Sequence, residues 1–160
     1  MALTVADIRQ RVATRMEAVA GWTESNTVGG PQWQGVGIPD PEQVRTFAVT
    51  CPTTTGNATG NQSDGQIAPS RGDVTVRTVV RVDWRANIRA DNQVADYDAA
   101  LNAEASFRTS LASIDRTGGL RLLEDTAAGS PRNQVQDETG RVIAIGGILN
   151  LIAVHPFARS

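Results

Sequence analysis

The feature that most constrains the fold is a long alternation of apolar and polar residues between Asp73 and Arg89. The apolar set is Val74, Val76, Thr78, Val80, Val82, Trp84, Ala86 and Ile88, and the intervening set is Thr75, Arg77, Val79, Arg81, Asp83, Arg85, Asn87 and Arg89. Strand side chains point alternately to opposite faces, so the pattern predicts one extended strand with an apolar face. Its length would be roughly 50 Å, about three times that of an ordinary strand. Such a strand either bends at a bulge or projects beyond its own domain.

Two segments have the period of an amphipathic helix, Thr4–Ala20 and Val94–Ile114. The apolar stripe of the first is Val5, Ile8, Val12, Met16 and Val19, and that of the second is Val94, Tyr97, Leu101, Phe107, Leu111 and Ile114. Thr4 and Asp7 have nearly the spacing of a capping box. Asp91 is the expected N-cap of the second helix.

Three further strands are expected, at Val44–Thr50, Leu120–Asp125 and Arg141–Val154. The last has apolar residues on both faces, which indicates a central strand.

The segment Pro52–Gly72 is rich in Thr, Gly, Asn and Ser and cannot bury enough apolar surface to offset its ordering entropy, so it is predicted to be a flexible loop. Thr126–Gly140 is expected to be a polar turn region.

These elements predict one domain over residues 1–160, since 160 residues is a single-domain length. The expected class is α+β: a mostly antiparallel sheet with one long strand, flanked by two amphipathic helices.

The composition argues against several kinds of chemistry. All 15 basic residues are Arg, so Schiff-base lysines and the P-loop lysine are excluded. One cysteine, Cys51, and one histidine, His155, are too few for a zinc site. No cofactor is therefore expected, no catalytic or metal-binding residue is assigned, and a non-enzymatic role is favoured.

The arginines of the long strand form the one constellation with a functional interpretation. Arginine is enriched at protein interfaces, because its planar guanidinium group makes bidentate contacts to carboxylates. The candidate intersubunit interface therefore consists of Arg77, Arg81, Asp83, Arg85 and Arg89. The alternative is a solvated strand face whose arginines pair with acids such as Asp83. Direct binding of nucleic acid is disfavoured because no aromatic side chains interleave with the arginines.

No membrane association is expected. The longest apolar run, Val142–Val154, is interrupted by Gly146, Gly147 and Asn150 and is too short to span a bilayer. The N-terminus has no secretory signal pattern, and a single cysteine fits a reducing compartment. A soluble protein made in a cytoplasm is the expectation.

The segments VTVRTVVRVDWRANIRADNQVADYDAALNAEASFRTSLASI, which begins at Val74, and RVIAIGGILNLIAVHPF, which begins at Arg141, resemble tail terminator proteins of long-tailed bacteriophages, the lambda gpU-like tail-completion family. The resemblance covers most of the chain from Asp73 onward together with the opening helix. It rests on the order of the elements and carries over no single functional residue. The loop at Pro52–Gly72 departs from the family, in which a shorter hairpin or arm is expected.

The resemblance implies a virion protein of the tail or neck, assembled in the host bacterial cytoplasm. Its copies would form a ring, commonly a hexamer, that caps the tail tube, stops polymerisation of the tube protein and offers a docking surface to the head-tail connector. DNA would pass through the lumen without specific binding. A head-completion or neck connector protein on the portal side is the alternative, and a small α+β enzyme or ligand-binding domain is the alternative of another class.

Overall fold

A computed structural model describes residues 3–25, 45–57 and 75–156. The elements in chain order are α1 (Val5–Glu17), β1 (Thr23–Glu24), β2 (Arg45–Asn57), β3 (Thr75–Asn87), α2 (Gln93–Leu111), β4 (Arg121–Glu124), β5 (Arg132–Gln136) and β6 (Val142–Pro156). The six strands form one sheet in the order β1-β2-β3-β6-β4, and β5 pairs with β6 on the same side as β4.

The sheet corrects the expected fold class in two respects. It is mixed, because β1 runs parallel to β2 while the other pairs are antiparallel. It also has three long strands, since β2, β3 and β6 contain 13, 13 and 15 residues. A two-residue strand such as β1 carries no periodicity, so the parallel pair left no signal in the sequence.

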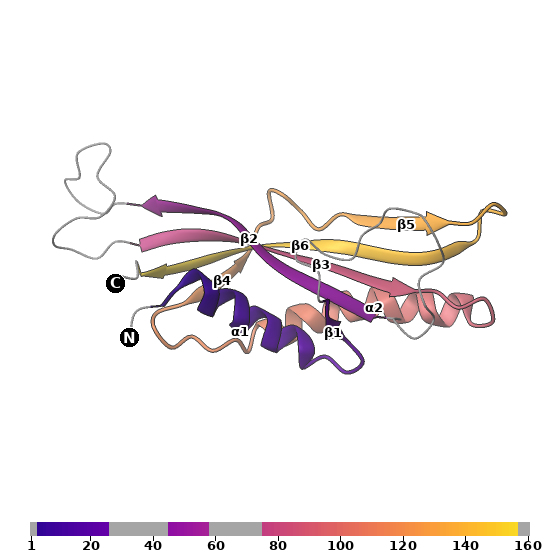
Figure 1. Ribbon diagram of the computed structural model, residues 1–160, viewed down its shortest axis with the longest axis horizontal. Coiled ribbons are helices and arrows are strands. Elements are labelled where there is room, and N and C mark those ends of the chain that lie inside the picture. The colour runs from indigo at the N-terminus through magenta and orange to yellow at the C-terminus, as the bar shows by residue number, and fades with distance from the viewer. Residues whose placement is uncertain (1–2, 26–44, 58–74, 157–160) are drawn as a thin grey trace.

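Both helices lie along the same face of the sheet, so they do not flank it on two sides (Figure 1). The long strands run past them toward the end at which β3 begins and β6 ends (Figure 1). The core lies between the helices and the sheet, where Trp22, Trp84 and Phe107 meet in edge-to-face contacts.

The alternation that predicted the long strand is confirmed. Every second residue of β3 from Val76 to Ala86 is buried, and from Val80 onward these residues belong to the core that the sheet shares with the helices. The strand has no bulge within its pairing to β6, so its length is accommodated by equally long neighbours. The bulge lies in β2, between Thr50 and Thr53.

Other boundaries shift for local reasons. The capping box of Thr4 and Asp7 is present at the start of α1. The N-cap of α2 is Asn92, one residue after the expected Asp91, and it makes no side-chain capping bond. Val94 is 74% exposed and therefore does not belong to the core stripe of its helix.

The prediction of a loop beginning at Pro52 is wrong for its first part. Pro52–Asn57 belongs to β2, where Thr53–Asn57 pairs with β3, and residues 58–72 lie outside the described residues. Every residue except proline has both backbone groups that a ladder needs, so polar composition did not prevent a strand here, and Pro52 lies in the irregular stretch between Thr50 and Thr53. The polar region Thr126–Gly140 likewise contains β5, whereas the short strand at Leu120–Asp125 and the central position of β6 are confirmed.

Neither helix in the described part of the chain combines the length and the apolar character that crossing a bilayer requires.

Candidate interaction surface

The predicted arginines occupy the sheet face that the helices leave open. Residues directly opposite one another in an antiparallel pair share a face. Val80 and Val82 point into the core, so Arg77, Arg81 and Arg85 point to the other side of β3. Arg89 lies beyond the end of this strand, in the turn that leads to α2.

Two of the arginines are engaged within the chain. Arg81 donates hydrogen bonds to both carboxylate oxygens of Asp83, at 3.0 Å to each, and Asp83 is only 7% exposed. Arg89 makes a similar fork with Asp96 at 2.9 and 3.0 Å. The hydrogen bonds from the Arg89 side chain hold the pKa of Asp96 below its ordinary value. These two guanidinium groups stabilise the fold of their own chain.

Arg85 and Arg77 differ from each other in exposure. Arg85 is half-buried, and this burial lowers the pKa of its guanidinium. Arg77 is exposed and forms no hydrogen bond or ion pair with any described residue. Within the predicted set, Arg77 is thus the member most available to a partner.

A second exposed arginine, which the sequence did not single out, lies beside Arg77. Val154 of β6 pairs with Arg77 of β3 on one side and with Arg121 of β4 on the other. The two arginines therefore share the open face, about 10 Å apart across β6. Arg121 also makes no hydrogen bond or ion pair in the described chain.

An apolar row borders these two arginines. Ile152 pairs with Val79 on β3 and with Leu123 on β4, so the three side chains lie next to one another on the open face. Val79 and Ile152 are half-buried and Leu123 is 44% exposed. We call Arg77, Arg121, Val79, Ile152 and Leu123 the open-face patch. A water-exposed apolar row with guanidinium groups at its border is typical of a protein interaction surface.

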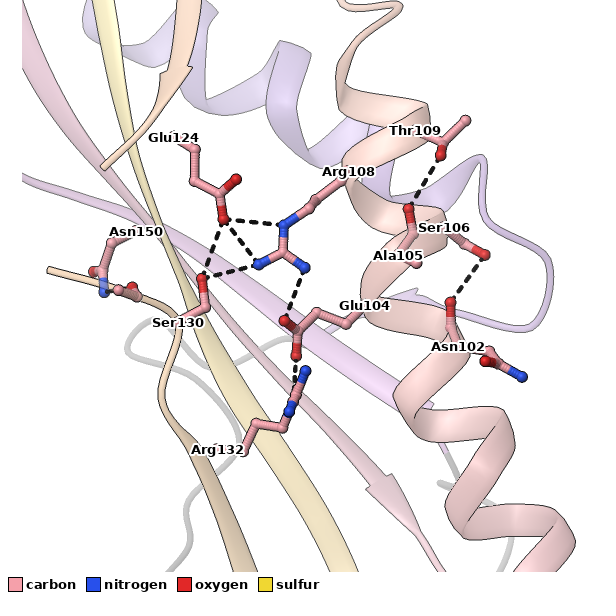
Figure 2. A network of polar contacts seen from close by, with 11 residues as sticks. Asn102, Glu104, Ala105, Ser106, Arg108, Thr109, Glu124, Ser130, Arg132 and Asn150 are labelled. Atoms are coloured by element: carbon pink, nitrogen blue, oxygen red, sulfur yellow. Dashed lines mark hydrogen bonds and ion pairs between the residues drawn. The ribbon is translucent and has the colours of Figure 1, made fainter. Parts of the chain in front are cut away.

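A polar network on the helix side of the sheet was not anticipated. Glu104 of α2 is 2% exposed and accepts hydrogen bonds from Arg108 at 2.9 Å and from Arg132 of β5 at 2.8 Å. Figure 2 shows Arg108 reaching onward to Glu124 and Ser130, which connects α2 to β4 and to the segment before β5. The spacing of Glu104 and Arg108 was visible in the sequence as an i, i+4 pair, but their distant partners were not.

The lone histidine and cysteine are not brought together. His155 is buried, and its Nε2 lies 2.8 Å from the hydroxyl of Thr78, which in turn lies 3.1 Å from the hydroxyl of Thr54. Cys51 is on β2, separated from β6 by the intervening β3. Burial lowers the pKa of His155 and raises that of Cys51, so each is held in its neutral form.

Metal-ligand clustering is also lacking in the described segments, where no three His, Cys, Asp or Glu side chains converge. A groove of about 690 Å³ lies open to solvent between α1 and residues 113–118. Its Arg11 is already bonded to the carbonyl groups of Asp115 and Thr117.

No protein-family model and no curated protein sequence matches this chain.

Proposed function

We propose that this chain is a structural assembly protein that forms a ring with copies of itself, caps a bacteriophage tail tube and provides the surface for joining the head. The observation that carries the proposal is the open-face patch, which lies on the long strands and on β4, on the sheet face that the described helices α1 and α2 leave uncovered. The resemblance of the sequence to tail terminator proteins supplies the biological setting.

The edges of the sheet support self-association. The outer edge of β2 pairs with β1 only at Thr46 and Phe47, so the described sheet offers no strand partner to it between Val49 and Asn57. The opposite edge consists of the short strands β4 and β5. An unpaired strand edge is a template for another strand, and two different surfaces that bind head to tail generate a ring when the rotation closes.

The charged groups support the same role. The buried carboxylates of the described chain, Asp83, Asp96 and Glu104, each bind arginine within the fold. Active sites of enzymes are usually concave pockets in which several titratable and polar groups converge on one point. A role in assembly accounts for these groups more simply.

The proposal is tested by measuring the particle mass of the purified chain over a range of concentrations, by light scattering or native mass spectrometry. The chain is then added to tail-tube polymers, and the tube ends are imaged. Rings of one discrete mass at one end of the tube, with elongation halted, are expected. A chain that ignores tubes and binds portal complexes would instead be a neck connector. A chain that stays monomeric and binds neither would overturn the proposal.

A further inference from the structure

The two large apolar side chains that stand out to solvent in the described chain are flanked by charges of opposite sign. Leu123 is accompanied by Arg77 and Arg121 in the open-face patch. Val94, 74% exposed, lies at the start of α2 between Asp91 in the preceding turn and Asp98 one helical turn later. Asp91 and Asp98 are exposed, and neither carboxylate forms an ion pair or accepts a hydrogen bond within the described residues.

The two surfaces lie at opposite ends of the molecule. Arg77 is near the start of β3, whereas the turn that leads to α2 follows the end of this strand at Asn87. Ten residues of strand separate them by roughly 33 Å. In Figure 1 the beginning of α2 and the strand β4 are likewise far apart along the long axis. The surfaces of one molecule therefore cannot bind each other.

Their composition is complementary. Each consists of an exposed aliphatic side chain beside two charged groups that form no ion pair or side-chain hydrogen bond with the described residues, although Asp91 lies near enough to Arg89 to raise the pKa of that guanidinium slightly further. Burying the aliphatic groups against each other removes apolar surface from water, while Arg–carboxylate pairs satisfy the flanking charges. We propose that the open-face patch is the docking site for the α2 start of a second copy, so that Leu123 and Ile152 contact Val94 while Arg77 and Arg121 pair with Asp91 and Asp98.

This contact deepens the proposed function, on which it rests. Because the two surfaces differ, the contact is heterologous, and each copy presents one surface of each kind to its neighbours. Repeating the contact from copy to copy yields a closed ring when a whole number of the rotations between neighbours adds up to one full turn. The contact also predicts an assembly that weakens as salt is raised, because exposed charge pairs are screened.

Charge reversal tests the contact directly. One variant carries Arg77→Glu and Arg121→Glu, and the other carries Asp91→Arg and Asp98→Arg. In each variant the open-face patch and the α2 start carry charges of the same sign and repel each other. The dissociation constant for self-association of each variant alone is therefore expected to be at least about tenfold higher than that of the wild type. When the two are mixed, every contact between unlike copies becomes complementary again. Assembly is expected to return with the variants in equal amounts, measured by native mass spectrometry.

Matched controls are Arg116→Glu and Glu17→Arg, exposed charges that belong to neither surface. They are expected to assemble as the wild type does. Circular dichroism and thermal unfolding establish that each variant is folded, and the neutral pair Arg77→Gln and Arg121→Gln replaces a reversal that fails to fold.

The outcomes separate the two proposals. A wild-type chain that is monomeric at every concentration overturns both self-assembly and this contact. A wild type that assembles while the reversed variants assemble equally well overturns the contact alone, as does a mixture that fails to recover. If Arg77→Glu and Arg121→Glu abolish binding to a mixed-sequence DNA duplex without weakening self-association, the patch is a nucleic-acid surface and the contact is likewise overturned.

Discussion

Gly147 and Trp84 face each other across β6 and β3, and the indole ring fills the space that a β-carbon on Gly147 would need. A Cβ built at Gly147 would lie 2.9 Å from three atoms of the ring, closer than real Cβ contacts. The same ring meets Trp22 and Phe107, so it has neighbours on the helix side as well. A small residue opposite a large one lets the central tryptophan pack directly on the sheet.

Gly147→Ala is therefore expected to destabilise the fold. The added methyl group must displace a fully buried indole, and overpacking of this kind costs about 1–3 kcal/mol. The check is urea denaturation followed by tryptophan fluorescence. Gly56→Ala is the matched control, because a Cβ at this strand glycine would lie 3.9 Å from Val76, an ordinary contact. Equal stability of the two variants would contradict the packing argument.

Arg81 and Arg77 are expected to differ although they lie on the same face of the same strand. Arg81→Ala leaves the nearly buried carboxylate of Asp83 without its bidentate partner, at a cost of about 1–3 kcal/mol. Arg77→Ala removes an exposed side chain with no partner in the described chain and should change stability by less than about 0.5 kcal/mol. Thermal unfolding of both variants measures the difference. If Arg77→Ala were the more destabilising change, the assignment of Arg81 to the fold would be wrong.

Glu104 is expected to fasten β5 to α2. Glu104→Gln keeps the shape of the side chain but removes the charge that binds two arginines, and we expect a loss of about 1–3 kcal/mol. A double-mutant cycle with Arg132→Met measures how much of this loss belongs to the pair. Glu17→Gln, an exposed carboxylate on α1, is the control. Additive effects of the two substitutions would show that Arg132 and Glu104 are not coupled.

His155 predicts a loss of stability on mild acidification. Burial lowers its pKa from the ordinary value of 6.5, so the unfolded chain binds the proton more readily than the folded chain. The free energy of unfolding is therefore highest above pH 6.5. It declines as the pH falls from about 6.5 toward the lower pKa that His155 has in the folded chain. The carboxylates whose pKa values are lowered, Asp96 among them, add their own decline only below about pH 4, so the decline that begins near pH 6.5 starts with His155.

The midpoint of urea denaturation is measured at intervals of half a pH unit for the wild type and for His155→Gln, and the two pH profiles are compared. This variant should lack the decline in stability that begins as the pH falls below about 6.5, whatever its overall stability. An identical slope in both proteins would assign the pH dependence to another group.

Local chemistry accounts for the elements that could be anticipated. The strict alternation along β3, the helical period and capping box of α1 and the two-sided apolar character of β6 act over a few residues or one strand, so they are visible in the sequence. The extension of β2 to Asn57 and the presence of β5 were missed because both are polar segments held by pairing with a neighbouring strand.

The candidate surface was foreseen only in part. The arginines of β3 were singled out, but their roles depend on which carboxylates the fold brings near, and Arg81 and Arg89 each find one on their own chain. Arg121 and Leu123 gave no signal, because their position beside Arg77 and Val79 is created by the pairing of β4 with β6.

By itself, then, the sequence determined one long amphipathic strand, two helices and an arginine-only set of cations, since these follow from residue type and spacing along the chain. Only the tertiary structure decided that three strands share that length, that both helices cover one face and that Arg77 and Arg121 border an apolar row. The physical reason is that register and neighbour choice are set by the burial of distant side chains against one another, and no local pattern specifies which distant residues will meet.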